Sequence, residues 1–129
     1  MEKNKIKVLI CDDEADFREL LHFWLESKGY TPILTSNGEE AIRIIQSENP
    51  DIVFMDLHMP ILDGVETIKR IRSFNKDIPI IMISAYVDDP KIILASKYGV
   101  SGVFYKGADF KDGLSLLETV LRTHKKLKT

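Results

Sequence analysis

The amino-acid sequence predicts an α/β fold in which a doubly wound, five-stranded parallel sheet is covered on both faces by five helices. The first observation behind this prediction is that short apolar runs alternate with amphipathic stretches five times along the 129 residues. The second is that the apolar runs are nearly continuous, as is typical of strands buried on both faces. Strands that alternate with helical stretches in this way form parallel sheets with helices packed on both sides.

Each expected strand is a run of branched and aromatic residues bounded by acidic or turn-forming residues. The second run contains Pro32, which has no backbone N–H to donate, and this predicts a strand at the edge of the sheet. The five expected strands span residues 6–12, 30–35, 51–56, 78–84 and 102–106.

The expected helices carry apolar residues three and four positions apart, so that these residues form one stripe. Gly29 is expected to end the first helix and Asn49-Pro50 the second. Pro90 suits the first turn of the fourth helix, and Gly99 suits its end. The stripes of the other four helices are Phe17, Leu20, Leu21, Trp24 and Leu25; Ala41, Ile42, Ile44 and Ile45; Val65, Ile68 and Ile71; and Leu114, Leu117, Val120 and Leu121.

Length and composition indicate one domain without a disulfide or a membrane segment. We expect a single domain over residues 1–129, with a core from about 5 to 123 and a basic tail at 124–129. Cys11 is the one cysteine, which excludes an internal disulfide and fits a reducing compartment. No apolar run is long enough for a signal peptide or a membrane span, so we expect a cytoplasmic protein. The net charge of -2 argues against a nucleic-acid surface.

Charged and hydroxyl-bearing side chains follow four of the five expected strands. The first strand ends in Asp12-Asp13, and the third ends in Asp56. Ser84 ends the fourth strand and Lys106 the fifth. Ligands bind beyond the carboxyl ends of the strands in such sheets, where the strand order reverses, so we expect these side chains to form one site.

The residue types at this edge favour a cation and a phosphoryl group. Three acids repel one another unless a positive charge neutralises them, and oxygen ligands without a set of His or Cys favour Mg²⁺ over Zn²⁺. A metal, an ammonium group and a hydroxyl around one carboxylate predict a site for a phosphoryl group. Singly, each residue also has an ordinary explanation as a turn residue, a helix cap or a solvated lysine.

The motifs at the strand ends resemble those of the receiver domain of two-component response regulators over essentially the whole chain. The stretches that carry the resemblance are VLICDDE, DIVFMDLHMPILDG, DIPIIMISA and GVSGVFYKG. The resemblance implies the flavodoxin-like doubly wound sheet, with strand order 2-1-3-4-5.

The resemblance also assigns roles to residues at the strand ends. Asp56 would be the nucleophile that accepts the phosphoryl group, which is recognised covalent chemistry for a carboxylate. Ser84 would donate a hydrogen bond to the phosphoryl group, and Lys106 would pair with it. The groups that would hold Mg²⁺ are Asp12, Asp13, Asp56 and the backbone carbonyl of His58.

By the same resemblance, the protein is a phosphorylation switch and not a turnover enzyme. A histidine kinase or a histidine phosphotransfer protein would phosphorylate Asp56, and the domain would catalyse only its own phosphorylation and dephosphorylation. The new charge would alter the binding of a downstream protein or a fused output domain at the face of the fourth helix, the fifth strand and the fifth helix. Dimerisation on phosphorylation is one such outcome. We expect no direct contact with nucleic acid or with a membrane.

Two other functions are open at the level of sequence. The first is a phosphate-independent protein-binding module; such modules typically lose a site residue, and none of the five is missing. The second is a phosphohydrolase with an aspartyl nucleophile, whose haloacid dehalogenase pattern requires Asp-x-Asp. The stretch Asp56-Leu57-His58 lacks the second acid. The 129 residues suit a stand-alone receiver and equally a piece of a longer regulator.

The loop after Asp56 contains residues with expected structural and tuning roles. Pro60 and Gly64 are expected to fix the turn, and Asp63 to cap the next helix. In the family, the positions two after the acceptor and two after the hydroxyl residue tune the lifetime of the phosphoryl group. Here they are His58 and Tyr86, and our hypothesis is that both restrict the attacking water. The alternative for His58 is an exposed residue that contributes only its carbonyl.

The sequence departs from the family pattern at two positions. The residue three before the Lys is usually a switch aromatic, and here it is Val103. Tyr105 lies on the same strand face, and it either substitutes for the aromatic or is a partly buried residue of an edge strand. The Lys is commonly followed by Pro, but Gly107 follows Lys106, which predicts a more mobile loop or another backbone form.

Overall fold

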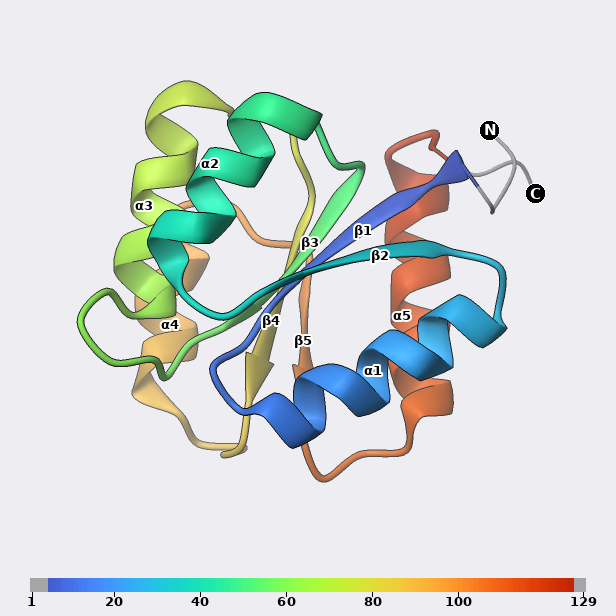
Figure 1. The fold of residues 1–129 in the computed structure, drawn as a ribbon. Helices are drawn as coiled ribbons and strands as arrows, with labels where there is room; N and C mark the ends of the chain where they lie inside the picture. Colours follow the sequence, from blue (N-terminus) through green and yellow to red (C-terminus); the bar gives the residue numbers. More distant parts are fainter. Residues whose placement is uncertain (1–4, 127–129) are drawn as a thin grey trace.

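Within residues 5–126, which are those that the structure describes, strands and helices alternate without exception in the computed structural model (Figure 1). The strands are β1 (Lys7–Cys11), β2 (Thr31–Thr35), β3 (Ile52–Asp56), β4 (Ile80–Ser84) and β5 (Gly102–Tyr105). The helices are α1 (Ala15–Ser27), α2 (Gly38–Glu48), α3 (Gly64–Phe74), α4 (Pro90–Ser96) and α5 (Phe110–Thr123).

The sheet has the predicted topology. Its strand order is β2-β1-β3-β4-β5, and each neighbouring pair is parallel. Helices α1 and α5 cover one face, and α2, α3 and α4 cover the other (Figure 1). The fold class and the strand order are therefore confirmed, and Pro32 lies in the edge strand β2 as predicted. Residues 127–129 of the predicted basic tail lie outside the described residues.

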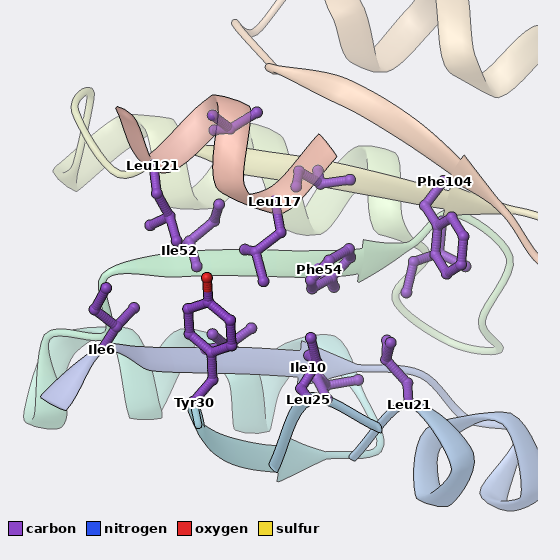
Figure 2. Packing of buried hydrophobic residues seen from close by; sticks show 14 residues of the cluster. Ile6, Ile10, Leu21, Leu25, Tyr30, Ile52, Phe54, Phe104, Leu117 and Leu121 are labelled. Atoms are coloured by element: carbon purple, nitrogen blue, oxygen red, sulfur yellow. The ribbon is translucent and has the colours of Figure 1, made fainter. Parts of the chain in front are cut away.

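The alternation of side chains along each strand sends them to two separate apolar clusters. In β1, Val8 and Ile10 pack in the cluster under α1 and α5, whereas Leu9 and Cys11 pack in the cluster under α2, α3 and α4. Figure 2 shows the first cluster, with Phe54 and Phe104 among the aliphatic side chains from β1, α1 and α5. Every residue of β3 and β4 is buried, so the side chains at their carboxyl ends are carried by the two most completely buried strands of the sheet.

Some predicted element boundaries and one predicted core residue were wrong. Leu20 is 58% exposed, because at 100° per residue it lies about 120° from the middle of the face that buries Leu21 and Leu25. Strand β4 begins at Ile80 rather than at residue 78, since Pro79 has no N–H to donate. Helix α4 ends at Ser96, before the predicted stop at Gly99.

The helices among residues 5–126 include none that combines the length and the apolar character needed to cross a membrane.

Candidate functional site

At the carboxyl ends of β1, β3 and β5, the structure brings together four of the five residues predicted to form the site. Asp56 is the last residue of β3 and is 2% exposed, and Asp12, which follows β1, is completely buried. One carboxylate oxygen from each of Asp12, Asp13 and Asp56 lies within 4.8 Å of the others. Lys106 follows β5, and its Nζ lies 3.1 Å from Asp12 Oδ2 and 3.6 Å from Asp56 Oδ2. The four residues form a compact group of acids around one ammonium group.

The ammonium group of Lys106 is held in the site by several partners. It donates hydrogen bonds to Asp12 Oδ1 at 3.2 Å and to Glu14, and it lies 5.1 Å from the centre of the Phe17 ring. Burial by itself would lower the pKa of Lys106, but the hydrogen bonds to Glu14 and Asp12 and the charge of Asp56 outweigh this and raise it. Lys106 is therefore a permanent positive charge next to Asp56.

The ionised form of the Asp56 carboxyl group is electrostatically unfavourable when no cation is bound. Burial first, and then the charge of Asp12, raise the pKa of Asp56 to about 8. A hydrogen bond of 3.1 Å from the backbone N–H of His58 and the charge of Lys106 act in the opposite direction. Full ionisation of Asp56 at neutral pH thus requires a further positive charge.

The acidic group has the chemistry of a magnesium site. Asp12 Oδ2 and Asp56 Oδ2 are buried, and within the described residues they accept no hydrogen bond. Asp13 is exposed and places a third carboxylate at the rim. Hard cations such as Mg²⁺ take carboxylate oxygens of this kind, and the group contains no His nitrogen or Cys sulfur that would favour Zn²⁺. The donors present therefore fit Mg²⁺.

The fifth predicted site residue, Ser84, is hydrogen-bonded to a residue that the sequence analysis did not single out. Ser84 is completely buried, and its Oγ donates to Asp89 Oδ2 at 2.8 Å. His58 Nε2 lies 2.6 Å from the same oxygen of Asp89. Asp89 is itself 4% exposed, and its Oδ1 accepts a hydrogen bond of 2.9 Å from the backbone N–H of Lys91, which caps α4. Asp89 thus links the ends of β3 and β4 to the start of α4.

His58 and Tyr86 lie together at the mouth of the site. Their rings pack edge to face, with 5.7 Å between the ring centres. They line a cavity of about 150 Å³ together with Glu14, Asp56, Ala85 and Lys106. The ring of His58 is thus held at the mouth of the site by its contacts with Asp89 and Tyr86.

The two departures from the family pattern have clear positions in the structure. Val103 is half-buried and packs against the apolar cluster under α2, α3 and α4. Tyr105 is a half-buried residue of the edge strand β5, paired in register with Ser84, as one of the two interpretations expected. Gly107 does not have a positive φ, and the backbone N–H of Ala108 donates to Tyr105 O at 2.9 Å. The loop is a hydrogen-bonded turn that does not depend on the left-handed backbone of a glycine.

The loop between β3 and α3 is built around a close backbone approach. Asp63 caps α3 as predicted, since its Oδ1 accepts a hydrogen bond of 2.9 Å from the backbone N–H of Glu66. A Cβ on Gly64 would lie 2.2 Å from the carbonyl oxygen of Asp56 and 2.7 Å from Leu57 Cα. Only a glycine lets the start of α3 pass so close to the backbone of the acceptor residue.

Sequence reasoning missed Asp89 and gave Glu14 no role. The local signal for Asp89 is an Asp directly before a Pro at a helix start, which is a typical cap. That signal explains the bond to Lys91 but not those to Ser84 and His58. The signal for Glu14 is its place directly after Asp12-Asp13, at the same end of the sheet as Lys106.

Comparisons with known proteins bear on the family and the fold of the chain. The sequence profile of the response regulator receiver domain matches residues 8–120. A probable transcriptional regulator ycf27 of Guillardia theta is 38% identical over 120 residues, which are 93% of this chain and 47% of that protein. The alkaline phosphatase synthesis transcriptional regulatory protein PhoP of Bacillus subtilis is 32% identical over 90% of this chain and 48% of that protein. The chain spans about half the length of these curated relatives.

Two of the solved structures with the same fold are matched over nearly their whole length. The chemotaxis protein CheY4 of Vibrio cholerae has a TM-score of 0.84 and 29% identity, covering 90% of this chain and 98% of that one. A two-component response regulator from Clostridium difficile has a TM-score of 0.85 and 29% identity, covering 92% of this chain and 97% of that one. Receiver domains serve two-component systems as phosphorylation switches. With the family profile matched from β1 to α5, the chain belongs to the response regulator receiver domain family.

Proposed function

We propose that this receiver is a Mg²⁺-dependent switch that accepts a phosphoryl group on Asp56 from a histidine kinase or a histidine phosphotransfer protein. The observation that carries the proposal is the position of Asp56, buried at the end of β3 beside Asp12 and the ammonium group of Lys106. Burying a carboxylate in such a place lowers the stability of the folded protein. Buried charges of this kind are found mainly at functional sites.

Phosphoryl transfer needs little from the protein beyond a nucleophile, correct positioning and positive charge. A carboxylate oxygen of Asp56 would attack the phosphorus of a phosphohistidine as the P–N bond breaks, and the electron pair of that bond would stay on the donor's imidazole. The product is an acyl phosphate. Lys106 would pair with a phosphoryl oxygen, and the hydroxyl of Ser84 would donate to another.

The acids would hold the metal on the side of Asp56 where its Oδ2 has no hydrogen bond. Asp12, Asp13, Asp56 and the backbone carbonyl of His58 would be the ligands. When bound, Mg²⁺ would supply positive charge that offsets the acids and the incoming phosphoryl group. This fits the raised pKa of Asp56, since a nucleophile has to be ionised.

The output surface that we propose is the face formed by α4, β5 and α5. Several large apolar side chains are exposed on α4 and on the loop before it, and this supports a protein partner there. They are Tyr86, Val87, Ile93 and Leu94. The relatives named transcriptional regulators are about twice as long as this chain, whereas CheY4 is matched over 98% of its length, so the partner that we propose is either a fused output domain or a separate protein. Dimerisation through the same face on phosphorylation is part of the proposal.

Cytoplasmic location is also part of the proposal. The single cysteine, Cys11, is buried and unpaired, and such a thiol fits a reducing compartment where two-component receivers meet their kinases.

Incubation with Mg²⁺ and a small phosphodonor, followed by intact mass measurement, tests the proposed reaction. We expect one phosphoryl adduct on the wild type and none on Asp56→Ala. Asp77→Ala, an exposed acid at the opposite end of the sheet, serves as the matched control and should keep the adduct. Absence of an adduct on the wild type under saturating donor would favour the phosphate-independent module. Continuous release of phosphate over many turnovers would favour the phosphohydrolase.

The rate at which the adduct is lost tests the role of the two rings at the mouth of the site. His58→Ala and Tyr86→Ala should each speed up dephosphorylation by about three- to tenfold, because each opens the cavity to water. Val87→Ala, an exposed residue of the same loop, is the control and should leave the rate unchanged. Unchanged or slower loss in both ring variants would mean that they do not shield the phosphoryl group.

A further inference from the structure

We propose that Asp89 is a positioning residue that accepts the one hydrogen bond that the Ser84 hydroxyl can donate. A phosphoryl group on Asp56 would then have to compete with Asp89 for this hydrogen bond. The inference rests on the proposed function of Asp56. Asp89 is placed for this role by its contacts: it is 4% exposed, and Ser84, His58 and the backbone N–H of Lys91 surround its carboxylate at 2.6 to 2.9 Å. No role in phosphoryl chemistry follows for Asp89 from its place in the sequence.

The competition follows from counting protons and lone pairs at Ser84. A serine hydroxyl has one proton to donate and two lone pairs. The backbone N–H of Tyr86 donates to Ser84 Oγ at 3.1 Å, which engages one lone pair. The acceptors in reach of the proton are Asp89 Oδ2 at 2.8 Å and Tyr86 O at 3.0 Å. A carboxylate is the stronger acceptor, so the proton belongs to Asp89. Ser84 can donate to a phosphoryl oxygen only after it releases Asp89.

The carboxylate of Asp89 would keep hydrogen-bond partners after the hydroxyl of Ser84 turned away from it. Burial would raise the pKa of Asp89, but the hydrogen bonds from Ser84, Lys91 and His58 outweigh it and lower the pKa, so the group is a carboxylate. If Ser84 turned away, the backbone N–H of Lys91 and the imidazole of His58 would still contact the two oxygens. The buried charge would not be stranded, and the start of α4 would stay capped.

This role can be separated from that of an ordinary helix cap. Asparagine and serine cap helices about as well as aspartate does, but neither carries the charge that makes Asp89 a strong competitor. If Asp89 were only a cap, Asp89→Asn would leave the binding of a phosphoryl mimic unchanged. If Asp89 competes for Ser84, the same variant would bind the mimic more tightly, and the gain would require the hydroxyl of Ser84.

The test is calorimetric titration with the beryllium trifluoride anion, a mimic of a phosphoryl group on a carboxylate, in the presence of Mg²⁺. Asp89→Asn should bind it about tenfold more tightly than the wild type, as expected when a charge-assisted hydrogen bond no longer competes. In the Ser84→Ala background the same substitution should give no gain. Asp88→Asn makes the same change of charge one residue away, at an exposed position, and should match the wild type.

Each other outcome overturns a distinct claim. A gain in Asp89→Asn that persists without the Ser84 hydroxyl, or an equal gain in Asp88→Asn, would show a general charge effect and overturn the inference. Wild-type binding with no gain in Asp89→Asn would overturn the inference alone and leave the proposed function standing. No binding by the wild type would overturn both. If Asp89→Asn fails to fold by thermal unfolding, Asp89→Ser makes the same comparison.

Discussion

Replacing Asp56 by asparagine is expected to stabilise the Mg²⁺-free protein by about 2 kcal/mol at about pH 8. Asp56 Oδ2 is buried, has no hydrogen-bond partner among the described residues, and lies in the same group as the Asp12 carboxylate. An asparagine amide keeps the shape, removes one of two repelling charges and is able to donate a hydrogen bond to Asp12. Asp56→Asn would thus stabilise the protein and abolish phosphorylation, because the carboxylate that the reaction needs lowers the stability of the fold.

The effect should depend on pH in a defined window. The pKa of Asp56 is raised from its ordinary value of 3.8 to about 8 in the folded protein. A raised carboxyl pKa adds stability that is complete below the unfolded value and is lost as the pH rises through the folded value. Between about pH 4 and about pH 8 the wild type should therefore lose stability relative to Asp56→Asn. Denaturant unfolding of both proteins in a chelator across this range measures the difference.

Mg²⁺ should reverse the order. A cation that binds the native wild type stabilises it by mass action, whereas the variant has lost one ligand and gains less. Asp13→Asn, which removes an exposed acid from the same group, should change the stability of the Mg²⁺-free protein by less than about 0.5 kcal/mol. Two results would contradict the electrostatic argument. One is an Asp56→Asn variant that is no more stable than the wild type at about pH 8. The other is a difference in stability between variant and wild type that is as large at about pH 5 as at about pH 8.

Most of the fold and the acidic half of the site follow from the sequence, because both rest on local patterns and one topological rule. The apolar run before Asp56 predicts a buried strand, and the parallel sheet then requires that Asp12, Asp56 and Lys106 meet at one edge. The distances between these three residues bear this out. The spacing of apolar residues predicted burial least reliably where a helix buries only a narrow face. Leu20 is the example, because it belongs to an apolar stripe that is wider than the face that α1 buries.

The hydroxyl half of the site could not be predicted in the same way. Asp89 contacts His58, 31 residues away, through an orientation of the β4–α4 loop that no periodicity encodes. The sequence indicates that Asp89 caps a helix, and the structure adds that the same carboxylate also binds Ser84. Because capping of α4 fully accounts for an Asp at position 89, the sequence contains no further sign of its contact with Ser84.

Replacing Gly64 by alanine is expected to destabilise the protein by about 3 kcal/mol, through contact with backbone that cannot move freely. The added Cβ would lie 2.2 Å from the carbonyl oxygen of Asp56 and 2.7 Å from Leu57 Cα. The backbone N–H of Gly64 also donates to Leu57 O at 3.2 Å, so the start of α3 cannot withdraw without breaking this bond. Relief of the clash would displace the backbone that carries Asp56, and phosphorylation of the folded variant should slow as well.

Gly107→Ala is the matched control, because the same methyl group is added at the same end of the sheet. A Cβ on Gly107 would have no atom within 4 Å, and Gly107 does not have a positive φ. That variant should be unchanged or up to about 1 kcal/mol more stable, since alanine restricts the unfolded chain. Denaturant unfolding and the rate of adduct formation compare the two variants directly. Equal stability of Gly64→Ala and Gly107→Ala would show that the loop tolerates displacement, and the acceptor would then be fixed by β3 alone.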